Sequence, residues 1–143
     1  MGTRSYIGIL ESSEGLNKKV IFIYCHYDGY PEGVGSTLVN HYYSPFKVDQ
    51  LIALGDLSSL GEEIGEKHDF ATHVQEHPKW CLAYMRDRGE RGCLPAWVSL
   101  KRYITDGDVP YKYLYNTETF EWECYSSSGE KLALELEMAA TTF

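Results

Sequence analysis

The sequence lacks any apolar run of the roughly 20 residues that a membrane-spanning helix needs. Residues 1–5 lack the apolar stretch of a secretory signal peptide. Positive charge is also scarce, with 13 basic against 21 acidic residues and a formal net charge of −8. We therefore expect no membrane partner and no duplex nucleic acid, because affinity for a phosphate backbone needs a large basic face. A small anionic ligand held by a few converging arginines is compatible with this charge.

Cysteine is sparse and scattered, without a C-x-x-C pair. A disulfide framework belongs to shorter, secreted chains with more cysteine. We therefore expect buried or half-buried free thiols in a reducing cytoplasm, at Cys25, Cys81, Cys93 and Cys124.

The chain has the composition of an ordinary globular protein. Its 143 residues are 43% hydrophobic and 24% charged, which predicts a single domain over residues 1–143. Aromatic residues make up 14% of the chain, and 12 of them are tyrosines. Tyrosine combines an apolar ring with a polar hydroxyl, so this excess suits ligand stacking, a subunit interface or a small aromatic-packed sheet.

Patterns of β-branched and aromatic residues predict the strands. Residues 4–10 and 19–27 predict an antiparallel hairpin around the polar segment 11–18. Further strands are expected over 80–85, 109–115 and 120–125, with a charged turn at 86–90 and another turn at 116–119. The predicted fold is α+β: an antiparallel sheet of about five strands with helices packed on it.

Helices and loops follow from glycine, proline and capping residues. Three glycines and a proline within residues 28–35 predict a loop, after which Ser36 or Thr37 caps a helix to about residue 43. Further helices are expected over 48–54, over 95–104 with Pro95 in the first turn, and over 130–138. Residues 55–79 are expected to be rich in loops.

The glycine-rich segment 24–38 is the first candidate site. A glycine-rich loop between a strand and a helix can turn several backbone N–H groups toward an anion. The spacing matches neither a P-loop nor the dinucleotide-binding fingerprint. A tight strand-to-helix connection therefore stays open as the alternative.

Arginines are the second candidate, because a guanidinium binds phosphate through two parallel hydrogen bonds. Arg86 and Arg88 lie in the charged segment 86–91, whose acidic residues are equally suited to pair with them on the surface. Arg4 begins the first strand, where it either binds a ligand or lies along the sheet edge.

Histidines offer weaker signals. His73 and His77 have the four-residue spacing of zinc ligands on a helix, but the H-E-x-x-H order is absent and Pro78 ends the segment. We therefore predict no metal site. His26 near Asp28 is either an acid–base pair or an anchor of the loop. Cys25 points to the opposite strand face from His26, and no G-x-S-x-G motif is present, so a non-catalytic protein is favoured.

Two motifs carry a family resemblance: MGTRS at residues 1–5 and IYCHYDGYPEGVG at residues 23–35. They resemble a widespread family of small phage proteins, in which tryptophan usually stands at the position of Tyr27. Later segments are similar in the same order, at residues 51–60, 86–90 and 111–115 before Trp122. The resemblance covers most of the chain.

This family is identified with anti-CBASS sponges, phage proteins that sequester the host's cyclic dinucleotide alarm signal without cleaving it. The resemblance implies a homo-oligomer, a dimer or tetramer, in the cytoplasm of the infected bacterium. It implies a ligand such as 3′3′-cGAMP and no cofactor. Together with the supply of arginine, glycine and tyrosine, it predicts these ligand-binding residues: Thr3, Arg4, Ser5, Tyr24, His26, Tyr27, Asp28, Tyr30, Gly33, Gly35, Thr37, Arg86 and Arg88.

Two other functions stay open from the sequence. A nucleotide-cleaving enzyme would use His26, Asp28 and His41 as acid–base groups. An acidic inhibitor would instead mimic an anionic surface and block a host protein, using Glu62, Glu63, Glu66 and Asp69.

Overall fold

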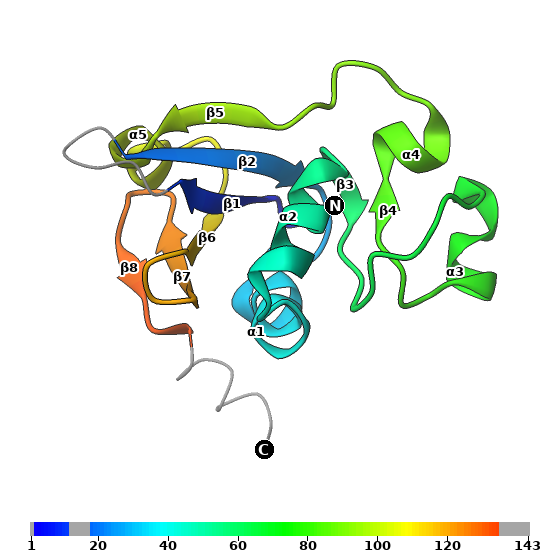
Figure 1. Cartoon of the computed structure of the whole chain (residues 1–143), viewed down its shortest axis with the longest axis horizontal. Coiled ribbons are helices and arrows are strands. Elements are labelled where there is room, and N and C mark those ends of the chain that lie inside the picture. Colours follow the sequence, from blue (N-terminus) through cyan, green and yellow to red (C-terminus); the bar gives the residue numbers. More distant parts are fainter. Residues whose placement is uncertain (1, 12–17, 135–143) are drawn as a thin grey trace.

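A single mixed sheet of eight strands organises the chain (Figure 1). The structure is a computed structural model, which describes residues 2–11 and 18–134. The strand order is β4-β3-β2-β1-β6-β7-β8, and β5 also pairs with β2. The strands are β1 (Ser5–Glu11), β2 (Lys19–Cys25), β3 (Leu57–Ser59), β4 (Leu82–Ala83), β5 (Ala96–Ser99), β6 (Tyr111–Asn116), β7 (Glu121–Ser126) and β8 (Lys131–Leu132).

The N-terminal hairpin is confirmed. β1 and β2 pair antiparallel from Ser5 opposite Cys25 to Glu11 opposite Lys19. Its predicted connecting loop falls mostly on residues 12–17, outside the described residues. The second predicted hairpin is confirmed as well, because β6 and β7 pair antiparallel around the turn that follows Asn116.

The sheet is larger than predicted and is not wholly antiparallel. β1 pairs parallel with β6, and β2 pairs parallel with β3. Parallel neighbours need a long crossover connection, which residue patterns within single strands do not reveal. The three strands that were not predicted, β3, β5 and β8, are only two to four residues long, too short for a recognisable alternation. The α+β class itself fits the structure.

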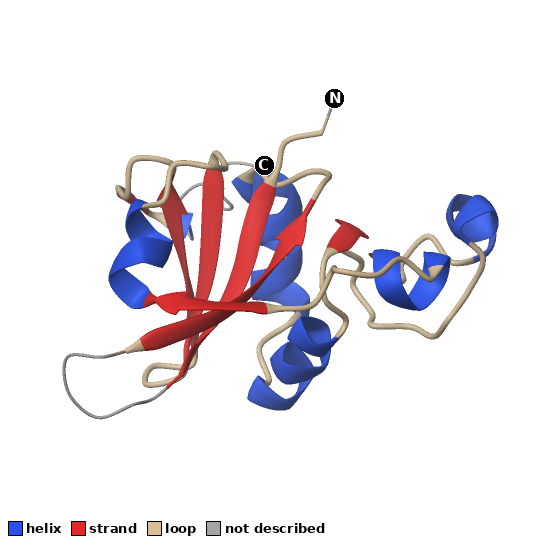
Figure 2. Ribbon diagram, turned by 90° about the horizontal axis from the view of Figure 1, so that it is seen from above, coloured by secondary structure: helices blue, strands red, loops and turns tan. Residues whose placement is uncertain are grey.

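Helices cover both faces of the sheet and extend beyond its β4 edge (Figures 1 and 2). α1 and α2 pack on one face over the larger core, which includes Ile7, Ile23 and Leu51. α5 packs on the other face, where Tyr103 is buried against Val20. The helices are α1 (Ser36–His41), α2 (Pro45–Ala53), α3 (His73–Glu76), α4 (Tyr84–Arg88) and α5 (Leu100–Thr105), with helical turns η1 (Pro31–Gly35) and η2 (Phe70–Thr72).

Several predicted elements have different bounds or types. The helix expected over 95–104 divides into β5 and α5, because Ser99 ends the strand and its hydroxyl accepts the Arg102 amide at 3.2 Å. The strand expected over 80–85 ends at Ala83, and the charged turn at 86–90 is largely helix α4, ended by Gly89 at φ +73°. β8 replaces the start of the helix expected over 130–138, whose residues 135–138 lie outside the described residues.

The structure also bears on the predictions made for the cysteines and for membrane-spanning helices. The four cysteines form no disulfide with one another; Cys25 and Cys81 are fully buried, and Cys93 is partly exposed. Among the described residues, no helix has the length and apolar character needed to cross a membrane.

Candidate functional site

The two motif segments meet at one end of the sheet. β1 begins at Ser5, opposite the last residue of β2, Cys25. Just beyond this pair, the Gly29 amide donates to the Thr3 carbonyl at 2.8 Å. A side chain at Gly29 would contact the Ser5 Cβ and the Thr3 carbonyl oxygen at 2.8 Å each. Segments separated by more than twenty positions in the sequence therefore lie against each other.

The glycine-rich segment is more regular than predicted. Pro31–Gly35 forms one π-helical turn, η1, that continues into α1, instead of an open loop. Asp28 enters the turn with a left-handed backbone, at φ +58°, and its carbonyl accepts the Val34 amide at 2.8 Å. A Cβ on Gly33 would lie 2.4 Å from that same Asp28 carbonyl oxygen. Only glycine therefore fits at position 33 without movement of the backbone.

The prediction of a side-chain cap at Ser36 or Thr37 is wrong. The capping position is Gly35, and the Thr37 hydroxyl donates back to the Gly33 carbonyl at 3.1 Å. The amides of Gly33 and Ser36 also donate within the turn. Because the turn uses these amides itself, a ligand at this end of the sheet would depend chiefly on side chains.

Arg4 is the exposed cation beside this turn. Among the described residues it forms no side-chain hydrogen bond or ion pair, and its charge acts on the Tyr24 phenol. Burial raises the pKa of Tyr24 by more than Arg4 lowers it, so this phenol stays protonated at neutral pH. The Tyr24 hydroxyl lies 2.7 Å from His26 Nδ1, and the Tyr27 ring meets His26 edge-on at 4.5 Å.

Tyr84, which the sequence did not single out, joins these residues from α4. The Tyr27 amide donates to the Ser58 carbonyl at 3.1 Å, and the Tyr84 hydroxyl bonds the Ser58 side chain. Burial is the main cause that raises the pKa of Tyr84, and the neighbouring Tyr27 adds to it. The Tyr84 phenol also raises the pKa of Tyr24 slightly, after the larger effects of burial and Arg4. We call Tyr24, Tyr27 and Tyr84 the tyrosine row.

The two predicted arginines of α4 have different surroundings. The Arg86 guanidinium donates to the carbonyls of Ile64 and Cys81 at 2.8 Å each and pairs with Asp87 at 2.9 Å. It therefore ties together the chain around α4. Arg88 is exposed and lies 5.4 Å from the centre of the Phe70 ring, which in turn stacks on Tyr84 at 6.0 Å. Arg88 therefore lies beside Phe70, which contacts Tyr84, whereas the charge of Arg4 acts on Tyr24.

The remaining predicted residues lie at the same end of the sheet. The Tyr30 hydroxyl donates to Asp28 Oδ1 at 3.2 Å, and both residues are exposed. Gly35 is buried, and a side chain there would meet Leu134 at 2.9 Å. Ser5 is fully buried, and its hydroxyl has no hydrogen-bond partner in the described part of the chain.

The acid–base candidates of the enzyme hypothesis are engaged with different partners. His26 bonds Tyr24, and Asp28 bonds Tyr30. His41, at the end of α1, lies 3.5 Å from Glu62. Across residues 2–11 and 18–134, no three His, Cys, Asp or Glu side chains are grouped to hold a metal ion.

A histidine cluster lies near α3. His68 Nε2 is 2.9 Å from His73 Nδ1, and His68 Nδ1 is 3.4 Å from an Asp87 carboxylate oxygen. His77 packs edge-on against His68 at 5.3 Å between ring centres. Burial, followed by the charge of His68, lowers the pKa of His73 below its ordinary 6.5, although Asp87 opposes this effect. The fold therefore favours neutral His73.

We expect acid to destabilise the protein through this cluster. The unfolded chain takes up a proton at His73 near the ordinary histidine pKa of 6.5, whereas the folded chain resists it. The free energy of unfolding should therefore decrease as pH falls below about 6.5. Urea unfolding at pH 7.5 and 5.5 measures the change. The loss of unfolding free energy between the two pH values should be smaller in His73→Leu than in His41→Gln. An equal loss in both variants would contradict the assignment of this pH dependence to His73.

Comparison of the chain with protein-family models, curated proteins and solved structures gave no match. The resemblance to phage sponges therefore stays a prediction that rests on the motifs themselves.

Proposed function

We propose that this chain is a phage anti-defence protein that binds a cyclic dinucleotide immune signal, such as 3′3′-cGAMP, and sequesters it without cleavage. The observation that carries the proposal is the position of Arg4. Its exposed guanidinium acts electrostatically on the Tyr24 phenol, at the end of the sheet where the two motif segments meet. A cyclic dinucleotide presents two phosphates and two flat bases, which suit arginine and tyrosine respectively.

The chemistry of sequestration needs affinity alone. Stacking of a base on an aromatic ring contributes about 1–3 kcal/mol, and a hydrogen bond to a charged group about 1.5–3 kcal/mol. The tyrosine row offers ring surface and protonated phenol donors, and Tyr27 is 46% exposed. At the upper end of both ranges, two stacked bases and two charged contacts contribute about −12 kcal/mol, the value of a nanomolar complex, before the cost of association is subtracted.

Arg88 supplies the second charged contact in this proposal. It lies over Phe70, which stacks on Tyr84. In the proposal, Arg4 contacts one phosphate of the ligand and Arg88 contacts the other. Arg86 would act indirectly, because its three partners hold α4 and thereby Tyr84 in place.

The proposal includes a homo-oligomer, a dimer or tetramer, in the cytoplasm of the infected bacterium. Tyr27 and Tyr30 leave 46% and 38% of their surfaces exposed at the proposed site. A second subunit placed over these rings would enclose the ligand and exclude water from its bases. Sedimentation velocity with and without 3′3′-cGAMP tests this assembly.

Tyr84→Ala tests whether the tyrosine row binds the ligand. Loss of one stacking surface should weaken binding of 3′3′-cGAMP about thirtyfold, at the middle of the stacking range of about 1–3 kcal/mol. Titration calorimetry measures the affinity. Phe46→Ala is the matched control, since Phe46 is 75% exposed on α2, outside the tyrosine row. Equal affinity of Tyr84→Ala and the unmodified protein would remove Tyr84 from the site.

A further inference from the structure

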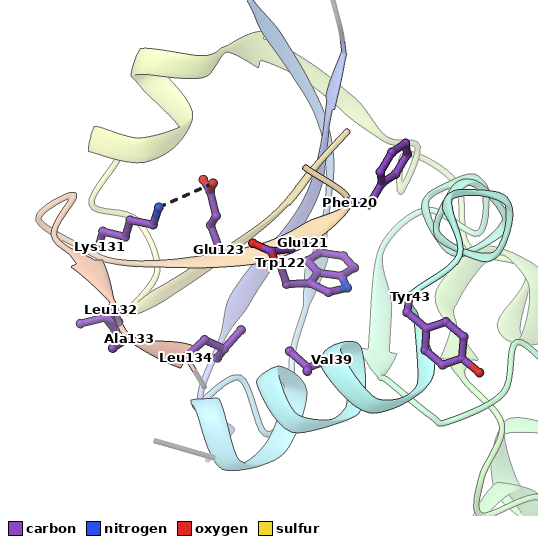
Figure 3. A pocket seen from close by; sticks show the side chains of 10 residues that line it. All are labelled: Val39, Tyr43, Phe120, Glu121, Trp122, Glu123, Lys131, Leu132, Ala133 and Leu134. Atoms are coloured by element: carbon purple, nitrogen blue, oxygen red, sulfur yellow. Dashed lines mark ion pairs between the residues drawn. The ribbon is translucent and has the colours of Figure 1, made fainter. Parts of the chain in front are cut away.

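Two margins of the sheet differ in how they are protected from other chains. Near the β7–β8 edge, Glu121, Glu123 and Lys131 line a cavity beside α1, and Glu123 pairs with Lys131 at 3.6 Å (Figure 3). Charged side chains of this kind keep an exposed edge from pairing with another sheet. β5 carries none over Ala96–Ser99. Among residues 2–11 and 18–134 it pairs with β2 alone, and it forms the upper margin of the sheet in Figure 1, so its outer edge is open to pairing.

The register between β5 and β2 fixes which backbone groups of β5 face away from β2. The Leu100 amide donates to the Lys18 carbonyl at 2.9 Å, so these opposite residues form a hydrogen-bonded pair. Hydrogen-bonded and non-hydrogen-bonded pairs alternate along antiparallel strands. Val98 and Ala96 therefore bond β2 through their backbone. Trp97, which stands between them, turns its amide and carbonyl outward.

The outward-facing backbone groups form a specific pattern. Trp97 presents both an amide and a carbonyl, and neither has a hydrogen-bond partner in the described part of the chain. Ser99 presents its amide alone, because it caps α5 and its carbonyl accepts the first hydrogen bond of that helix. The same alternation turns Pro95 outward, and proline presents a carbonyl alone because it has no N–H group.

Two copies of this edge are complementary about a twofold axis at Trp97. In antiparallel pairing, Trp97 donates to and accepts from the partner's Trp97, and the Ser99 amide donates to the partner's Pro95 carbonyl. The donor that Pro95 lacks lies opposite the Ser99 carbonyl, which α5 already uses. A register shifted by two residues would place Pro95 opposite Trp97 and leave a Trp97 carbonyl unbonded. The backbone pattern therefore favours one symmetric register.

The side chains of β5 suit the same arrangement. Trp97 lies opposite Ile21 of β2 and is 58% exposed, so the indoles of the two copies would lie side by side on one face of the sheet. Aromatic residues directly opposite each other stabilise antiparallel pairing. On the other face, Ala96 would lie opposite Val98 of the partner subunit, a small residue beside a branched one. No charge on β5 opposes its own copy.

We propose that two copies of this chain pair their β5 strands antiparallel about a twofold axis at Trp97 and so join their sheets. The pairing buries little surface besides the two indoles, so we expect a weak dimer that dissociates in the micromolar range. It does not rest on the proposed function, because β5 pairs with residues 19–22, whereas the Arg4 site lies at the other end of β2. It is also distinct from the ligand-enclosing contact over Tyr27 and Tyr30, and the two interfaces together would give a tetramer.

Sedimentation velocity without nucleotide tests the pairing, at loading concentrations up to about 500 µM. The unmodified protein should show a reversible monomer–dimer equilibrium. Trp97→Lys should weaken the dimer at least about 100-fold, because it places two ammonium groups side by side on the twofold axis. Phe46→Lys is the matched control, since Phe46 is 75% exposed on α2 and this change should leave the dimer intact. Both substituted side chains are exposed, so the melting temperature of each variant should change by only a few degrees.

Disulfide formation tests the register. The pairing puts position 96 of one copy opposite position 98 of the other, at a Cα separation of about 4.5 Å that a disulfide can span. Equivalent positions are about 8 Å apart, too far for a disulfide. In a Cys93→Ser background, which removes the partly exposed thiol, an equal mixture of Ala96→Cys and Val98→Cys should form covalent dimers on oxidation, and either variant alone should not.

Three results would overturn the proposal: a protein that stays monomeric at about 500 µM, a dimer that survives Trp97→Lys, or cross-linking of one cysteine variant alone as fast as of the mixture. Arg4→Glu separates the dimer from the proposed function, because it should dimerise like the unmodified protein while losing 3′3′-cGAMP. Failure of nucleotide binding would leave the β5 pairing standing, and a monomeric protein would leave nucleotide binding at Arg4 standing.

Discussion

Arg4→Glu is expected to reduce the affinity for 3′3′-cGAMP at least about 100-fold. The change removes a charge-assisted contact of up to about 3 kcal/mol and places a carboxylate beside the ligand phosphate. Each 1.4 kcal/mol corresponds to a factor of ten. Arg4 is exposed and makes no hydrogen bond or ion pair within the described residues, so the melting temperature should change by only a few degrees.

Arg102→Glu is the matched control for this change. Arg102 is exposed on α5, which begins beside Lys18 at the opposite end of β2 from Tyr24, and the same charge reversal there should leave binding intact. The affinity of Arg4→Lys for 3′3′-cGAMP should lie between those of Arg4→Glu and Arg102→Glu, because lysine keeps the charge but loses the planar pair of donors. If Arg4→Glu binds normally, or if its fold collapses together with binding, the assigned role of Arg4 is wrong.

Gly33→Ala should impair both the fold and the site. The new Cβ would lie 2.4 Å from the Asp28 carbonyl oxygen and 3.0 Å from the Asp28 Cβ. Because the first of these is a backbone atom, the turn itself must move, at a cost of about 1–3 kcal/mol in the free energy of unfolding. The displaced turn carries Tyr30 and lies against Thr3 through Gly29, so ligand affinity should also fall about tenfold or more.

Gly107→Ala provides the comparison for Gly33→Ala. A Cβ at Gly107 would meet its nearest neighbour, the Ser127 carbonyl oxygen, at an ordinary 3.5 Å. Urea unfolding and titration calorimetry on both variants measure the two effects. Equal stability of the two variants would show that the turn adapts to a side chain. Normal ligand affinity of Gly33→Ala would show that the conformation of the turn does not matter for binding.

The sequence predicts the elements that carry long, repeated signals. The β-branched run from Val20 to Ile23 and the aromatic alternation from Tyr111 to Tyr115 both lie in central strands. Residues 95–104 misled the prediction because Pro95 suits the first turn of a helix, whereas pairing with β2 fixes Ala96–Ser99 as a strand. Tertiary pairing of this kind overrides local preference, and a single short segment does not encode it.

The candidate site was predictable only in part. Motif residues such as Arg4, Tyr24 and Asp28 do come together at one end of the sheet. Tyr84 follows β4 and is brought to Ser58 by the pairing of β3 with β4, which no local sequence pattern predicts. A cavity lined by Val39 of α1, Trp122 of β7 and Leu134 was missed as well, because it depends on where β8 stops pairing with β7.

The central claim is sequestration without cleavage, and a heat-release experiment tests it most directly. Purified protein is mixed with 3′3′-cGAMP and a small panel of other cyclic nucleotides, and free nucleotide is chromatographed before and after heat denaturation of the protein. We expect a stoichiometric loss of free nucleotide that is fully reversed, as the intact molecule, on heating. A new nucleotide species would instead show an enzyme, and a free pool that never changes would contradict nucleotide binding for that panel.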